Sequence, residues 1–165
     1  MLALAADIVF ARAGVVLNPH YKSMGLYGSE YWTYSLPRAV GSEIAHKLTE
    51  ECLPISAIQA QQWGMVQDIG PRCPSAFSAW LLQAAQGALS DEKYAAQRMR
   101  KATIDLEPMD RCRQNELAQM ELDMVHNRQQ FAEKCRNFVF KRKACQTPQR
   151  LIAPWALARK GELVD

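Results

Sequence analysis

The second half of the sequence has a helical pattern, and this most limits the folds open to the chain. From Ser75 onward, apolar residues recur at helical spacing across SAFSAWLLQAAQGAL, in a segment capped by Ser90, and in a long segment over residues 110–143. Runs typical of strands lie nearer the N-terminus, in DIVFAR, in residues 15–17 and in MVQDI. The sequence therefore predicts an α+β, mostly helical chain with a few short strands near its N-terminus.

Three shorter helices are predicted between the strand-like runs. Ser29 is a plausible N-cap for a helix across EYWTYSL, and Pro37 is expected to stop it. A second helix spans residues 41–51 and begins at Ser42, and a third is capped by Ser56 and closed by Gly64. The second helix presents one apolar side, made of Ile44, Ala45, Leu48 and Cys52.

The long C-terminal segment carries an apolar stripe. Its members are Leu117, Met120, Met124 and Phe131, with Phe138 further on. A stripe at this spacing is more typical of a core or a subunit interface than of a cofactor contact.

Composition places the chain among soluble globular proteins and argues against several functions. Apolar residues make up 48% and charged residues 22%, and no run approaches the roughly 18–20 apolar residues of a membrane helix. Without a convincing export signal, we expect a cytoplasmic protein that does not bind membranes. The 5 cysteines are widely spaced and do not combine with the 3 histidines at metal-ligand spacing, so no metal is expected.

Positive charge gathers near the C-terminus. A net charge of +3 is too small to predict nucleic-acid binding, but residues 134–150 hold six lysines and arginines: Lys134, Arg136, Lys141, Arg142, Lys143 and Arg150. This run is either a solvated helix face or a site for an anion such as phosphate.

The chain opens abruptly on Met1 and the apolar string LALAA. A helix normally begins with a polar cap, and none precedes this string. The opening therefore predicts that the chain is an N-terminally truncated fragment.

Several short motifs follow one another from Leu2 to Ala144. They are LALAADIV at residues 2–9, Pro19-His20, RAVG at 38–41, Leu48-Thr49, SA followed by GMV within 56–66, and FVFKRKA at 138–144. Their order resembles that of the crotonase (enoyl-CoA hydratase/isomerase) family. The resemblance implies the C-terminal part of a crotonase core over residues 1–71 and a helical C-terminal subdomain over 72–145. It also implies that the oxyanion-hole donors of the family precede Met1. The prolines, the glycine and the scattered charges after Cys145 predict an extended tail over 146–165.

Three strings narrow the resemblance. They are NPHYK at 18–22, LYGSEYWTY at 26–34, and NFVFK at 137–141 followed by Thr147-Pro148. They are similar to the C-terminal crotonase-like domain of HypX/HoxX-type hydrogenase maturation proteins. This similarity implies coenzyme A as a formyl or other acyl thioester, an absent N-terminal formyltransferase-like domain as a partner, and possible homo-oligomers. The implied reaction is that of a lyase, which converts formyl-CoA to carbon monoxide and CoA for a nickel–iron site.

The resemblance also assigns site residues. Crotonase-type hydratases use a carboxylate after the proline of the loop, but His20 follows Pro19 here, which disfavours ordinary hydration. Tyr21 and Glu30 become the expected catalytic pair, with His20 as a helper. On spacing alone Glu30 could instead be a capping charge in the first turn of a helix, Tyr21 part of an aromatic core, and His20 a turn residue.

The remaining assignments concern CoA and leave alternatives open. Phe138 is expected to lie against the adenine, with Lys141 and Lys143 on phosphates, unless this segment is a plain basic helix face. The resemblance also leaves two other readings of the chain open. It could be a generic acyl-CoA hydratase or isomerase, or a remnant that packs but has lost its activity.

Overall fold

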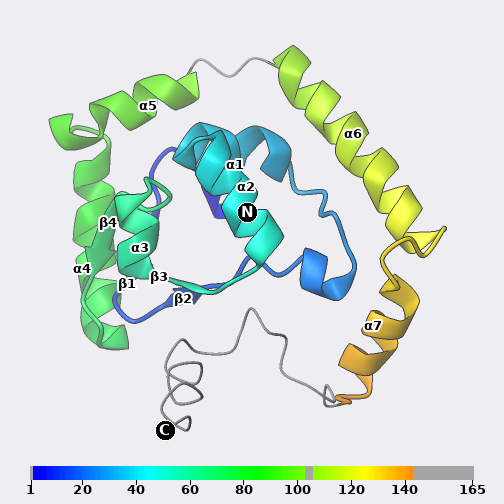
Figure 1. Ribbon diagram of the computed structural model, residues 1–165. Coiled ribbons are helices and arrows are strands. Elements are labelled where there is room, and N and C mark those ends of the chain that lie inside the picture. Colours follow the sequence, from blue (N-terminus) through cyan, green and yellow to red (C-terminus); the bar gives the residue numbers. More distant parts are fainter. Residues whose placement is uncertain (1, 103–105, 143–165) are drawn as a thin grey trace, which may run out of the picture.

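The computed structural model describes residues 2–102 and 106–142. Two helices, α1 (Trp32–Val40) and α2 (Ser42–Glu51), lie at the centre, and the other helices surround them (Figure 1). On one side are α3 (Ala57–Gln62), α4 (Pro74–Ala88) and α5 (Ala95–Ala102). On the other are α6 (Leu106–Met124) and α7 (Phe131–Val139). Three short 3-10 helices complete the set: η1 (Leu2–Ala5), η2 (Lys22–Met24) and η3 (Glu92–Tyr94).

The four described strands form two small sheets. β1 (Phe10–Arg12) pairs in parallel with β4 (Asp68–Gly70), with Phe10 opposite Asp68. β2 (Val16–Leu17) pairs antiparallel with β3 (Ile55–Ser56). The parallel pair brings residues some 58 positions apart together, as in Val9 N–H, which donates to Gln67 Oε1 at 2.7 Å. The predicted class, mostly helical with short strands near the N-terminus, is confirmed.

The core lies between the central helix pair and the sheets. α1 contributes Leu36, which is fully buried, and α2 contributes the apolar side expected for it. The buried cluster is made of Leu4, Leu36, Val40, Ala45, Leu48, Ala60, Met65 and Val66. This packing fixes the positions of α1 and α2, and it therefore also fixes the chain segments that precede and follow α1.

The limits predicted for the first helix are wrong. α1 begins at Trp32 after an N-cap at Tyr31, so Ser29 is not its cap, and it runs through Pro37 to Val40. A proline inside a helix removes one backbone hydrogen bond. Here Leu36 and Val40, on either side of Pro37, are both buried, so burial favours the continued helix. By contrast, the cap at Ser56 is confirmed, because its Oγ accepts from Gln59 N–H at 3.1 Å.

The C-terminal half also departs from prediction in places. Asp91, not Ser90, caps the turn before α5, because its carboxylate accepts from Lys93 N–H at 2.8 Å. The long predicted helix is two helices, since Asn127 and Gln130 adopt positive φ between α6 and α7. The division of the chain near residue 71 stays a prediction, and the expected tail lies outside the described residues.

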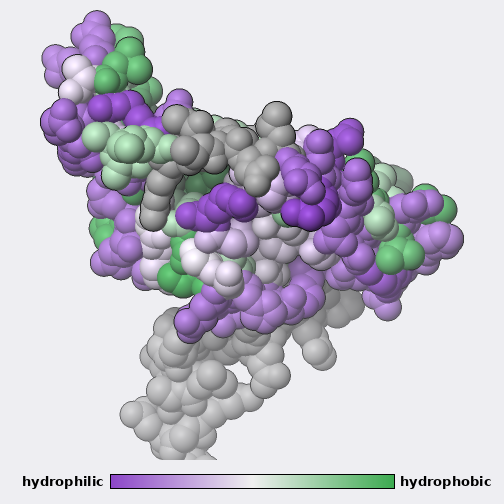
Figure 2. Space-filling view, turned by 90° about the horizontal axis from the view of Figure 1, so that it is seen from above, coloured by the Kyte–Doolittle hydropathy of each residue, from purple (hydrophilic) through white to green (hydrophobic). Residues whose placement is uncertain are grey.

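The apolar stripe is not part of the core in the described structure. Leu117, Met124 and Phe138 are 46%, 54% and 71% exposed, and the residues of α6 that are fully buried are Glu116 and Asp123. On the face shown in Figure 2, hydrophilic residues predominate and hydrophobic ones form separate small groups. A subunit interface at the stripe stays a prediction. Within the described residues, no helix has the length and apolar character needed to cross a bilayer.

Candidate functional site

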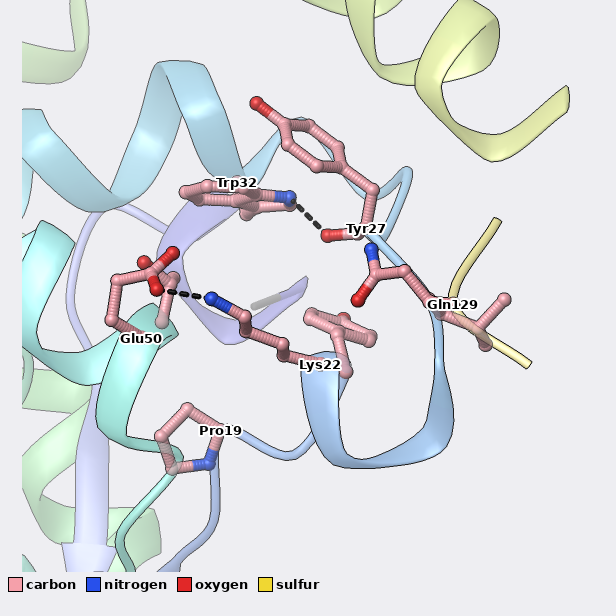
Figure 3. Close-up of a pocket in the computed structure, with 9 residues that line it drawn as sticks. Pro19, Lys22, Tyr27, Trp32, Glu50 and Gln129 are labelled. Atoms are coloured by element: carbon pink, nitrogen blue, oxygen red, sulfur yellow. Dashed lines mark hydrogen bonds and ion pairs between the residues drawn. The ribbon is translucent and has the colours of Figure 1, made fainter. Parts of the chain in front are cut away.

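A pocket of about 130 Å³ lies where η2, the start of α1 and the end of α2 meet (Figure 3). Its walls are formed by Pro19, Tyr21, Lys22, Leu26, Tyr27, Trp32, Thr49, Glu50 and Gln129. An ion pair between Lys22 and Glu50 crosses it, and Trp32 Nε1 donates to the Tyr27 carbonyl at 2.9 Å. The pocket therefore combines aromatic walls with one pair of opposite charges.

Tyr21 and Glu30 meet beside this pocket. The Tyr21 hydroxyl donates a hydrogen bond to the Glu30 carboxylate, and both side chains are half-buried. Partial burial, the hydrogen bond to Glu30, and the negative charges of Glu30 and Glu116 raise the pKa of Tyr21 well above that of a free phenol. At neutral pH Tyr21 is therefore a protonated donor. The structure brings the predicted pair together.

Glu30 does not have the alternative role that its spacing suggested. It precedes the N-cap Tyr31, so it lies outside the first turn of α1, and its carboxylate is directed to Tyr21 instead. The expectation that Glu30 lies at the start of that helix is wrong by two residues. The reason is the left-handed Tyr31, with φ 55°, which turns the chain before the helix begins.

Gly28 leaves room for the Tyr21 ring because it has no Cβ. Its φ is +93°, and a Cβ built on it would lie 2.9 Å from Cδ2 of Tyr21 and 3.1 Å from Cδ1 of Trp32. Only glycine allows this conformation together with so close an approach. The ring of Tyr27 packs at 5.2 Å from that of Trp32, so part of the aromatic string does serve packing.

The segment that carries Glu30 is anchored on α6. Glu116 accepts from the N–H groups of Tyr31 and Thr33, each at 2.8 Å, and Asp123 accepts from Tyr27 N–H at 2.8 Å. Sequence reasoning missed both acidic residues, because acidic side chains on a helix usually face solvent. The available signal was their seven-residue spacing, which puts them on one helix face.

His20 lies beside the pair but outside it. It is exposed, its Nδ1 hydrogen-bonds with the Asn18 carbonyl at 2.9 Å, and its ring stacks on Tyr21 with centroids 6.1 Å apart. Its role as a helper stays a prediction.

The residues expected to hold CoA lie apart from the pocket wall. Phe138, on α7, is 71% exposed, and Lys141 is exposed just after that helix. Lys143 lies outside the described residues. An exposed aromatic ring can stack on an adenine and an exposed lysine can pair with a phosphate, so the CoA-binding role of Phe138 and Lys141 stays a prediction. Within residues 2–102 and 106–142, no group of three or more potential ligands is placed to hold a metal ion.

Comparison with known proteins places this geometry in a family. The enoyl-CoA hydratase/isomerase family model matches residues 1–147. Hydrogenase maturation factor HoxX of Bradyrhizobium diazoefficiens is 37% identical over 153 residues, which are 89% of this chain and 27% of HoxX. The chain thus spans about a quarter of that relative.

Solved structures give the same result. The A392F-I419F variant of HypX from Aquifex aeolicus is 34% identical, with a TM-score of 0.79, over 90% of this chain and 28% of HypX. HypX in complex with tetrahydrofolic acid has a TM-score of 0.77 at the same identity and coverage. An enoyl-CoA hydratase from Mycobacterium avium subsp. paratuberculosis is 22% identical over 88% of this chain and 58% of its own, with a TM-score of 0.70, a similarity of fold alone. The predicted resemblance to HypX/HoxX-type proteins is confirmed, and the chain belongs to the enoyl-CoA hydratase/isomerase family.

Proposed function

We propose that this chain forms part of a cytoplasmic lyase domain that converts formyl-CoA to carbon monoxide and CoA, for the maturation of a nickel–iron hydrogenase. The observation that carries the proposal is the hydrogen bond from the Tyr21 hydroxyl to the Glu30 carboxylate beside the pocket. The similarity of the chain to hydrogenase maturation factor HoxX supports the proposed role in hydrogenase maturation. Because the chain spans 27% of HoxX, the activity is proposed for the complete protein, including a formyltransferase-like domain.

The proposed reaction needs one proton removed and one supplied. The formyl C–H bond breaks and its hydrogen leaves as a proton, the C–S bond breaks to release carbon monoxide, and the CoA thiolate takes up a proton. Glu30 is a carboxylate able to accept the first proton, and Tyr21 is a protonated phenol able to donate the second. The proton that Glu30 gains can return to Tyr21 along their hydrogen bond, which restores both groups.

The assay that tests this function compares two substrates. The complete protein is expected to release carbon monoxide from formyl-CoA, which is detected by its binding to reduced haemoglobin. It is expected to hydrate crotonyl-CoA at least about 10²-fold more slowly than it releases carbon monoxide, because Pro19 is not followed by a carboxylate. Faster hydration of crotonyl-CoA would favour the generic hydratase. Turnover of neither substrate would favour the inactive remnant.

CoA binding is proposed to use Phe138, Lys141 and Lys143. Lys141→Ala is expected to weaken CoA binding about threefold to fivefold at low salt, since an exposed charge pair contributes up to about 1 kcal/mol. Isothermal titration calorimetry at low and high salt measures this, and Lys47→Ala, an exposed lysine on α2, is the matched control. Affinity that does not respond to salt or to Lys141→Ala would identify the segment as a plain basic face.

A further inference from the structure

The direction of the Glu30 side chain depends on a strained neighbour. Tyr31 has φ 55° and ψ 29°, in the left-handed region that side chains with a Cβ rarely adopt. It follows Glu30 directly and is the N-cap of α1, but its own side chain makes no capping hydrogen bond. Such a conformation persists where surrounding contacts hold it.

Glu116 supplies the contacts that hold Tyr31. One carboxylate oxygen accepts from Tyr31 N–H at 2.8 Å, and the other accepts from Thr33 N–H at 2.8 Å and from Thr33 Oγ1 at 2.6 Å. The side chain is fully buried. Its charge lies at the N-terminus of α1, where the helix dipole favours an anion. Glu116 therefore replaces the capping side chain that Tyr31 lacks.

Two further residues of α6 extend this attachment toward η2. Met120 Sδ accepts from Gly28 N–H at 3.3 Å, and Asp123 accepts from Tyr27 N–H at 2.8 Å. Residues 116, 120 and 123 share one face of α6, so the segment from Tyr27 to Thr33 follows that face. Figure 1 shows this segment on the side of α1 that faces α6.

We propose that Glu116 is a positioning residue for the Tyr21–Glu30 pair, which it aligns through the backbone of Tyr31. The inference rests on the proposed function only where it concerns catalysis. Glu116 holds the turn at Tyr31, the turn directs Glu30, and Glu30 receives the Tyr21 hydroxyl. A purely structural cap would stabilise α1 without affecting Tyr21.

The state of the Tyr21 phenol separates these two roles without any substrate. The full 165-residue chain is labelled with ¹³C at the tyrosine ζ carbons and titrated by NMR from pH 7 to pH 11, with Tyr21→Phe to assign the signal. Glu30 and Glu116 are the charged groups that act on Tyr21. In the unaltered chain Tyr21 is expected to remain a phenol throughout, and to form phenolate within this range once Glu30 is displaced.

The variants separate alignment from charge. Glu116→Asp keeps the charge but is too short to reach both N–H groups, and Thr33→Val keeps Glu116 but removes one donor. In both variants the phenolate form of Tyr21 is expected to appear within the titrated range, below pH 11, because Glu30 no longer accepts the phenol proton. Thr33→Ser, which keeps the hydroxyl, and Glu121→Gln, an exposed glutamate on α6, are expected to match the unaltered chain.

Each outcome decides the proposal. A folded Glu116→Asp or Thr33→Val chain in which Tyr21 stays a phenol to pH 11 would overturn it, and if Glu116→Asp does not fold, the Thr33 pair alone decides. In the complete protein, Thr33→Val is expected to lower kcat for formyl-CoA at least about fivefold, with KM changed less than twofold. Failure of the proposed function would appear separately, as carbon monoxide release unaffected by Glu30→Gln while the Tyr21 titration still shifts.

Discussion

Glu30→Gln is expected to lower the rate of carbon monoxide release from formyl-CoA by about 10²–10⁴-fold, the usual contribution of a positioned acid or base. The amide keeps the shape of the side chain and one acceptor for the Tyr21 hydroxyl, but it cannot take a proton from the formyl group. The effect should fall on kcat, because the proton transfer to Glu30 takes place only in the transition state. The measurement is single-turnover release of carbon monoxide by the complete protein.

Two companion variants make the result specific to the pair. Tyr21→Phe removes the proposed proton donor. Because the proposal has Tyr21 and Glu30 act as a unit, the double variant is expected to release carbon monoxide only slightly more slowly than the slower of the two single variants. Glu43→Gln, at an exposed position on α2, should be indistinguishable from the unaltered protein. Unchanged release of carbon monoxide from Glu30→Gln would end the proposed role.

Arg128→Met is expected to reduce the free energy of unfolding by about 3 kcal/mol. Asp123 is fully buried, and Arg128 is its cationic partner, with Nη2 at 2.8 Å and Nε at 2.9 Å from Oδ1. Loss of one partner leaves a buried charge uncompensated, at about 3–5 kcal/mol. We expect the lower end of this energy range, because the Arg128 side chain is 37% exposed and Asp123 still accepts the hydrogen bond from Tyr27 N–H. Urea unfolding followed by tryptophan fluorescence measures the change.

The controls for Arg128 use the same chain. Arg113→Met, at an exposed site on α6, should change stability by less than about 0.5 kcal/mol. Adding Asp123→Asn to Arg128→Met should recover about half of the loss, since the amide oxygen still accepts from Tyr27 without a charge. A loss below about 1 kcal/mol for the single variant would show that solvent, not Arg128, compensates Asp123.

Local signals were enough to predict most elements of the fold. The cap at Ser56, the apolar side of α2 and the strands at residues 10–12 and 68–70 follow from periodicity and turn chemistry. The errors arose where burial in the core or a positive φ sets the limits of a helix. α1 continues through Pro37 because Leu36 is buried in the core, and the break before α7 depends on positive φ at Asn127 and Gln130.

The candidate site was predictable only in part. The resemblance indicated Tyr21 and Glu30, but neither composition nor spacing showed that a left-handed Tyr31 would move Glu30 out of the helix and toward the phenol. The burial of Glu116 and Asp123 could not be recognised, because the backbone N–H groups that bury them against the segment from Tyr27 to Thr33 lie more than 80 residues earlier in the chain. Backbone donors leave no pattern in a sequence.

The anchoring of the Glu30 segment on α6 has a consequence for how the chain matures. Its acceptors lie 85 and 96 residues downstream of Tyr31 and Tyr27. At a synthesis rate of about 5–20 residues per second, Glu116 is added roughly 4–17 seconds after Tyr31. α1 and α2 can pack early, because they contact each other over a short stretch of chain. The Tyr21–Glu30 pair forms later, because the contact between Tyr31 and Glu116 closes a loop of 85 residues. We therefore expect α1 and α2 to fold first, and the Tyr21–Glu30 pair to be aligned among the last events of folding.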